Sequence, residues 1–241
     1  MNAPSLFVAS TLAIDRLFDQ DGRIIQEQSG GPCLFIRRVL ERENIPFTAL
    51  TPSEPARVDI RIQSGEEIGS VVYVPTFPID WKTILAPNLL ISTIQDEISL
   101  EGVEEYSGRL FMDVQGFVRL LKQQGLKWRL SDSLKQQVFC LKATEDECRF
   151  IDPAFIEEQK TRLLLMTRGA KGVMYWVSGM RFEVAPKEVI RTSDTLGAGD
   201  TFFAYVVAGI LRGQPIKKVV QEAVQKTSDF LTSKSHHTTP L

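Results

Sequence analysis

Short runs of apolar residues with high β propensity alternate with amphipathic segments along most of the chain, and this alternation restricts the fold more than any other feature. Strands are predicted at 6–9, 47–50, 88–93, 110–114, 138–141 and 162–167, and helices at 34–43 and 117–124. Because a strand, helix, strand order leaves neighbouring strands parallel, the sequence predicts an α/β fold with a mostly parallel sheet.

Two parts of the chain depart from this order. Residues 57–63 alternate strictly between apolar and polar side chains, and 69–74 form a second extended run, so the two predict a strand pair with one wet face. This pair is either a small flap or an edge hairpin of the main sheet. Further on, Asp152 and Pro153 start a short helix, and 172–177 with 181–184 predict a hairpin.

Composition and charge exclude several functional classes. The chain has 241 residues, 43% of them hydrophobic, and its 28 basic and 30 acidic side chains give a net charge of −2 without a block of one sign. One soluble domain is expected, and neither nucleic acid nor a membrane surface is an expected partner. The longest apolar run, 202–211, is shorter than the ~20 residues that span a bilayer, and no signal peptide is recognisable, so a cytoplasmic location is expected.

Cysteine and histidine do not carry the function. Cys33, Cys140 and Cys148 form no C-x-x-C pair, which suits a reducing compartment. His236 and His237 are the only histidines and lie in a polar tail, so a zinc site or a Ser-His-Asp triad is not expected.

The most informative segment is a glycine-rich turn, 194–201, directly before the apolar helix predicted at 202–211. Free amides and the positive end of the helix dipole at such a turn bind phosphate oxygens. Asp200 at the helix start would repel a phosphate, and its presence indicates a base that deprotonates an attacking hydroxyl. The alternative is that Asp200 caps the helix and the glycines form a tight turn. No P-loop and no dinucleotide-binding fingerprint occurs.

Residues 194–202 read D-T-L-G-A-G-D-T-F, and this stretch resembles the C-terminal signature of the ribokinase-like (PfkB-type) carbohydrate kinases. The resemblance implies a three-layer α/β/α fold, a single domain over 1–241, and transfer of the γ-phosphoryl group of ATP with Mg²⁺. It implies that Asp200 is the general base and that the amides of Gly197, Ala198 and Gly199 bind the transferred group. Asp194 and Thr195 would lie at the nucleotide, with Asp194 near a metal or monovalent cation.

The resemblance extends to the N-terminal part of the chain. Gly30 and Gly31 are similar to the di-glycine that shapes the sugar pocket of the family, and Asp15 lies where the family has a carboxylate for substrate hydroxyls. Taken without the C-terminal signature, the glycines are an ordinary turn and Asp15 is an exposed loop carboxylate.

A second glycine-containing turn, 167–172, resembles the segment of the family that follows the nucleotide phosphates. Thr167, Gly169, Lys171 and Gly172 are the residues implied. A tight β-hairpin is the alternative, and the two interpretations are compatible.

Three departures from the family pattern limit what carries over. Thr144 replaces the Asn of an N-x-x-E element that organises Mg²⁺; Glu147 is kept as an indirect metal residue, although Thr144 and Glu147 also fit a capping box. Residues 226–241 contain no glycine, whereas the family has a Gly-Ala turn there that supplies carbonyls to a monovalent cation, so potassium activation does not carry over. The segment between Leu50 and Asn88 is short, which predicts a reduced β lid within 12–28 and 57–74.

The expected activity is therefore ATP-dependent phosphorylation of a sugar, polyol or nucleoside hydroxyl by a monomer or homodimer. Residues 112–119, M-D-V-Q-G-F-V-R, resemble the inositol-kinase branch and favour a cyclic polyol or a nucleoside as acceptor, although the same residues also fit a strand end followed by a capped helix. Two rivals remain: a non-catalytic ligand sensor that kept the fold, and a kinase that uses a donor such as ADP or pyrophosphate.

Overall fold

The main sheet has eight strands in the order β12-β11-β10-β9-β8-β7-β1-β4. The computed structural model describes residues 5–63, 66–190, 192 and 194–235, so His236 and His237 lie outside it. The strands are β1 Leu6–Ser10, β4 Phe47–Leu50, β7 Asn88–Ser92, β8 Arg109–Asp113, β9 Val138–Thr144, β10 Leu163–Thr167, β11 Val173–Val177 and β12 Met180–Val184. The six strands from β4 to β10 pair in parallel, and β11 and β12 form an antiparallel edge.

Helices cover both faces of this sheet. One face carries α1 Pro32–Arg42, α5 Ala198–Leu211 and α6 Ile216–Ser235, and the other carries α2 Gln115–Gln124, α3 Asp132–Gln137 and α4 Pro153–Lys160. Short 3₁₀ turns occur at Trp81–Thr83, Val103–Glu105, Glu147–Phe150 and Gly169–Lys171. Consecutive strand residues such as Leu89 and Leu90 pack into the cores on opposite faces of the sheet, because successive side chains of a strand point to opposite faces. The predicted three-layer α/β/α architecture is confirmed.

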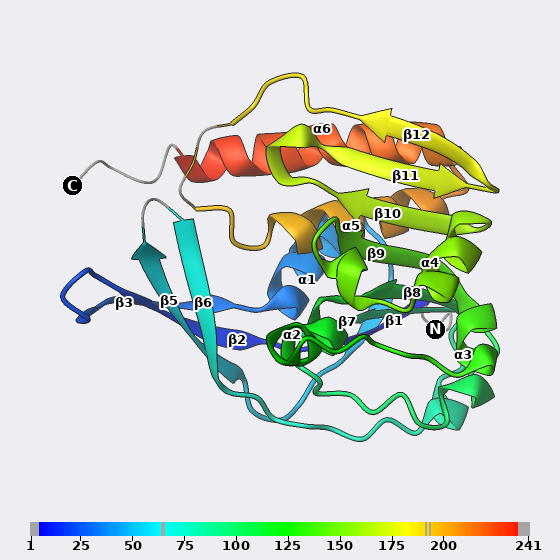
Figure 1. Ribbon diagram of the computed structural model, residues 1–241, viewed down its shortest axis with the longest axis horizontal. Coiled ribbons are helices and arrows are strands. Elements are labelled where there is room, and N and C mark those ends of the chain that lie inside the picture. Colours follow the sequence, from blue (N-terminus) through cyan, green and yellow to red (C-terminus); the bar gives the residue numbers. More distant parts are fainter. Residues whose placement is uncertain (1–4, 64–65, 191, 193, 236–241) are drawn as a thin grey trace.

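A second sheet of four strands stands apart from the main one, at the left of Figure 1. Its order is β3-β2-β5-β6, with β2 Ala13–Phe18, β3 Ile24–Gly30, β5 Ala56–Gln63 and β6 Glu66–Tyr73. The strand pair predicted at 57–63 and 69–74 therefore belongs to a separate small sheet and not to the edge of the main sheet. A buried cluster that includes Val58, Ile60 and Ile94 forms its core, and Leu196 packs against this cluster.

The strand order indicates where a ligand would bind on the main sheet. From β1 the chain crosses to β4 on one side, whereas β7, β8, β9 and β10 follow in order on the other side. Adjacent crossovers therefore diverge between β1 and β7, and in open parallel sheets ligands bind at such a point, at the carboxyl ends of the strands.

Some predicted boundaries differ from those observed. The apolar helix begins at Ala198 rather than Phe202, which brings Asp200 into its first turn. Strand β9 continues beyond Leu141 to Thr144 and so contains Lys142. Helix α3 was not predicted because it has only six residues, too few for a helical period to show. No helix of the described residues is long and apolar enough to cross a membrane.

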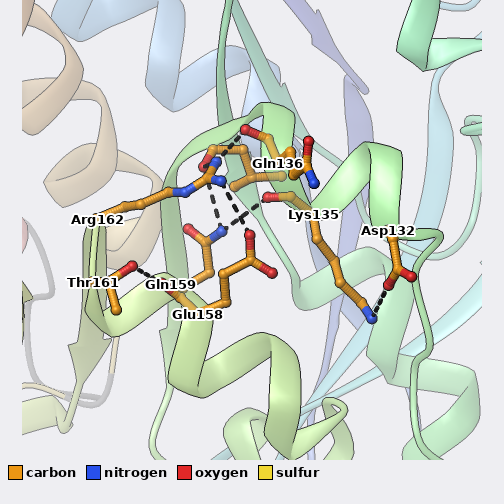
Figure 2. Close-up of polar contacts among 8 residues, drawn as sticks. Asp132, Lys135, Gln136, Glu158, Gln159, Thr161 and Arg162 are labelled. Atoms are coloured by element: carbon orange, nitrogen blue, oxygen red, sulfur yellow. Dashed lines mark hydrogen bonds and ion pairs between the residues drawn. The ribbon is translucent and has the colours of Figure 1, made fainter.

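A polar network fastens α3 and α4 to the start of β9, at the end of the sheet opposite the carboxyl ends of the parallel strands (Figure 2). The guanidinium of Arg162 donates to the carbonyls of Gln136 and Val138 and to Glu158 Oε1. The side-chain amide of Gln159, which is fully buried, donates to the carbonyls of Lys135 and Val138 at 3.4 and 3.3 Å. Carbonyls at the end of α3 and the start of β9 thus share side-chain donors from residues 159–162.

We expect Gln159→Leu to lower the free energy of unfolding by about 1 kcal/mol, because the Lys135 carbonyl loses its amide donor whereas the Val138 carbonyl still accepts from Arg162. Urea unfolding followed by tryptophan fluorescence measures this. Glu157→Gln on the exposed side of the same helix is the control, with an expected change within about 0.5 kcal/mol. Equal stability of the Gln159→Leu variant and wild type would show that the network contributes nothing.

Candidate active site

The turn that precedes α5 has the backbone of an anion-binding site. Gly197 is the N-cap, with φ +76°, and a Cβ there would lie 2.4 Å from the ring of Phe35, so only glycine fits. The Ala198 amide donates to the carbonyl of Thr195 at 3.1 Å, whereas Gly199 and Asp200 are first-turn residues whose amides have no acceptor one turn earlier. The amides of Gly199 and Asp200 therefore lie at the positive end of the α5 dipole, whereas the Ala198 amide, one of the three expected to bind the anion, already donates to Thr195.

Asp200 is fixed by contacts with strands and not by a capping bond. Its Oδ1 lies 3.3 Å from the hydroxyl of Ser92 at the end of β7, and the same hydroxyl lies 3.3 Å from Oδ2 of Asp113 at the end of β8. One hydroxyl proton can serve only one carboxylate at a time. Because Gly197 is the N-cap, the alternative that Asp200 caps the helix is wrong.

A buried lysine lies beneath this turn. The ammonium of Lys142 in β9 donates to Asp113 Oδ2 at 2.8 Å, and the two side chains are 3% and 1% exposed. Its Nζ is 3.1 Å from the position that a Cβ on Gly199 would occupy. Burial disfavours the charged ammonium, but the carboxylates of Asp113, Glu147 and Asp200 outweigh this effect and raise the pKa of Lys142 above its ordinary value. A permanent positive charge therefore lies under the first turn of α5.

The environment of Asp200 makes its carboxylate a stronger base than an exposed aspartate. Burial raises the pKa of Asp200 to about 6; Lys142 opposes this increase, and Asp113 adds to it. The group is thus ionised at neutral pH and holds a proton more tightly than an ordinary aspartate, as a general base requires.

Asp15 and Gly30 lie against each other at the base of the small sheet. Asp15 is 2% exposed, and its Oδ2 has no hydrogen-bond partner among the described residues. A Cβ on Gly30 would lie 1.7 Å from this oxygen, so any larger residue would displace the carboxylate. Burial raises the pKa of Asp15 to about 6, and Lys234 and Asp194 modulate it with opposite signs. Gly31 is the N-cap of α1, as expected for a glycine pair that opens a helix.

Thr144 and Glu147 form the capping box that their spacing predicts. The Thr144 amide donates to Glu147 Oε2 at 2.7 Å, and the Glu147 amide donates to Thr144 Oγ1 at 3.1 Å. Glu147 also interacts electrostatically with Lys142, so it lies on the rim of the buried charge cluster. One carboxylate oxygen of Glu147, Oε2, is therefore already bonded within the capping box.

The turn at 167–172 is a tight hairpin one strand beyond Thr144. The Gly172 amide donates to the Gly169 carbonyl at 2.9 Å, the Lys171 amide donates to Arg168, and Lys171 itself is exposed. The Thr167 carbonyl accepts from Glu145 at 3.0 Å, which joins the ends of β9 and β10. The hairpin interpretation is confirmed, and the exposed Lys171 at this edge is available to an anion.

The structure therefore gathers the predicted residues into neighbouring groups. Asp200 and the 197–199 turn form one group, Asp15, Gly30 and Asp194 form a second, and the 167–172 turn lies further along the strand ends. Ser92, Lys142, Lys234 and Arg119 were missed by sequence reasoning. Burial lowers the pKa of Arg119, and the nearby carboxylates of Glu147, Glu97, Asp200 and Asp113 oppose this shift. Of these four residues, only Lys142 could have been noticed in the sequence, because it is a charged residue within an otherwise apolar strand.

Comparisons with known proteins agree with this geometry. Residues 128–239 match the model of the pfkB family carbohydrate kinases. No curated protein matches the chain significantly.

Solved structures share the fold over almost the whole chain. Ribokinase of Arabidopsis thaliana with ribose and ATP has a TM-score of 0.66 at 17% identity, with 92% of this chain and 91% of that chain covered. A pyrophosphate-dependent kinase in the ribokinase family with a pyrophosphate analogue and myo-inositol has 0.67 at 17%, covering 92% and 93%. Adenosine kinase of Schistosoma mansoni with 2-fluoroadenosine has 0.67 at 12%, covering 96% of each chain.

At these identities the structures establish the fold. The chain has a ribokinase-like fold, and its residues 128–239, which include the α5 turn, match the model of the pfkB family of carbohydrate kinases.

Proposed function

We propose that this protein transfers the γ-phosphoryl group of ATP to a hydroxyl of a small sugar, polyol or nucleoside. The observation that carries the proposal is the placement of Asp200: a half-buried carboxylate in the first turn of α5, beside amides that lack helical acceptors and close to a buried ammonium. A site that bound phosphate alone would gain nothing from a carboxylate, whereas a hydroxyl that attacks phosphorus must lose a proton.

The chemistry assigns one role to each group. Asp15 orients the acceptor, and the hydroxyl oxygen bonds to the γ-phosphorus while the bond from phosphorus to the bridging oxygen of the donor breaks. Asp200 takes the hydroxyl proton. The amides of Gly199 and Asp200, with the dipole of α5, stabilise the charge on the transferred group. Lys142 offsets the negative charge that accumulates around Asp200.

The residues fit a Mg²⁺ ion that arrives with the nucleotide. The described residues contain no cluster of three or more His, Cys, Asp or Glu able to hold a metal, and Mg²⁺ usually binds through substrate phosphates, waters and one or two carboxylates. Glu147 is the carboxylate at the edge of the site that would bind a metal water. When bound, the ion would neutralise charge on the donor phosphates.

The small sheet would cover the acceptor. Asp15 lies in β2, and the core of the sheet touches Ile94 just after β7 and Leu196 in the α5 turn. A cover there would exclude water, which competes with the acceptor hydroxyl for the phosphoryl group. This is the role we assign to the strands within 12–28 and 57–74.

Substrates are to be identified by direct assay. Inositols, ribose, fructose and nucleosides are offered as acceptors, each with ATP, ADP or pyrophosphate as donor. Acceptor-dependent consumption of ATP supports the proposal. Consumption of pyrophosphate instead would assign the other donor, as in the pyrophosphate-dependent kinase among the structural neighbours. Nucleotide binding without transfer to any acceptor would favour the ligand-sensor alternative.

We expect Asp200→Asn to lower kcat by roughly 10²–10⁴-fold, because the amide cannot accept the hydroxyl proton. Nucleotide affinity, measured by calorimetry, should change little, because the amides of the turn remain. Turnover near the wild-type rate would contradict the assignment of the base.

We expect Gly30→Ala to raise the acceptor KM by roughly 10- to 100-fold, because the new methyl group displaces the Asp15 carboxylate and its charged hydrogen bond to the acceptor. Gly69→Ala is the matched control in the same sheet, since its Cβ would make an ordinary 3.7 Å contact with Val58. Equal acceptor KM values for the two variants would exclude Asp15 from the pocket.

Activity should fall at a higher pH than for an enzyme with an ordinary aspartate base. Asp200 must be deprotonated to act, and its pKa is raised to about 6, so log(kcat/KM) should be level above about pH 7 and fall by about one unit per pH unit below 6. Asp15, with a pKa also raised to about 6, makes the fall steeper. A profile that stays level to about pH 4.5, with fluorescence showing the folded state, would contradict this.

A further inference from the structure

The last turn of α6 inserts a lysine into the turn that leads to the anion-binding amides. The Lys234 ammonium lies 2.5 Å from Asp194 Oδ1 and 2.9 Å from the carbonyl of Leu196. Leu196 directly precedes Gly197, the N-cap of α5. A single cation thus fixes both a carboxylate and a carbonyl of this turn to a helix that is far away in sequence.

Two aromatic rings lie next to the Lys234 ammonium, and one of them, Phe35, also contacts the turn before α5. Its Nζ lies 5.8 Å from the centre of the Phe35 ring and 5.4 Å from that of Phe230, and the two rings pack edge to face. Phe35 is also the ring against which Gly197 packs. The Lys234 and Asp194 side chains are only 20% and 29% exposed. The positive charge is therefore held by oxygen atoms and ring faces and is partly shielded from water.

These contacts do not fit a free monovalent cation at Asp194, which the family resemblance implied. A carboxylate oxygen and a backbone carbonyl are suitable ligands for such an ion, but here both already bind the Lys234 ammonium. A potassium ion on the same oxygens would lie beside another positive charge, and the two would repel each other. The glycine-free segment 226–241 contains the lysine that takes these ligands.

We propose that the Lys234 ammonium is a built-in monovalent cation that holds the 194–197 turn in its anion-binding shape, so that this protein needs no potassium. The proposal rests on the proposed function for its catalytic consequence, and Lys234 is a positioning residue that does not touch the reacting atoms. Leu196, whose carbonyl the lysine holds, packs with its side chain against the core of the small sheet. Lys234 therefore links α6, the anion-binding turn and the cover of the site.

The experiment uses wild type, Lys234→Ala and Lys218→Gln. Alanine leaves space for an ion between Asp194 and Leu196, and Lys218 is a 57% exposed lysine of the same helix that pairs with Glu222, which makes it the matched control. Each protein is titrated with KCl, methylammonium chloride or choline chloride at constant ionic strength. The readouts are melting temperature, nucleotide affinity and kcat.

For wild type and Lys218→Gln, potassium should give the same values as choline in every readout. For Lys234→Ala in choline, we expect a melting temperature lower by about 2–4 °C. We also expect weaker nucleotide binding and a kcat lower by roughly 10- to 100-fold, because the turn is no longer held in position. Potassium or methylammonium should restore a large part of each loss, which a purely structural role of the lysine stem would not allow.

Three results would overturn the proposal. The first is saturable, potassium-specific stabilisation or activation of the wild type, which needs no variant to be observed. The second is a Lys234→Ala protein that matches wild type, and the third is a Lys234→Ala protein whose losses do not respond to either cation. If no acceptor is phosphorylated by wild type, the proposed function fails, but melting temperature and nucleotide affinity still decide the role of Lys234.

Discussion

The buried ion pair between Lys142 and Asp113 is the interaction on which the candidate site depends. Removing two charges from water is costly, and the pair is retained only because its geometry is close and further groups share the charges. The Ser92 hydroxyl lies within hydrogen-bonding distance of both Asp113 and Asp200 and can donate to either carboxylate. Three adjacent strands and the first turn of α5 are thereby locked into one register, and the Asp200 carboxylate is oriented by these neighbours.

A consistent electrostatic arrangement follows from this pair. The α5 dipole and its amides attract anions, whereas the carboxylates of Asp200 and Asp113 repel them. The positive charges of Lys142 and Arg119 offset the negative charge of these carboxylates. Above the turn, Lys234 compensates Asp194 in the same way. Lysines on two different elements thus offset the negative charge of the carboxylates around the turn, so the amides at the start of α5 can still attract an anion.

Much of the fold was predictable because it follows from local patterns. Apolar runs identified the parallel strands, Gly125 ended α2 in the left-handed conformation, and Asp152 capped α4 as expected. The least predictable part was the small sheet: β2 pairs in parallel with β5, across 37 intervening residues counted from Phe18 to Ala56, and periodicity cannot assign such a partner. The six-residue α3 was missed because its length hides its period.

The sequence by itself determined the α/β class, the glycine-rich turn before α5 with its aspartate, and the Thr144 and Glu147 capping box, because each follows from contiguous residues whose spacing has a direct meaning for the backbone. Only the tertiary structure decided that Lys142, Ser92 and Lys234 belong to the site. Each is an ordinary residue in its own segment, and its role arises from partners 29 to 108 positions away. Packing brings these side chains within bonding distance, and neither composition nor local periodicity encodes that distance.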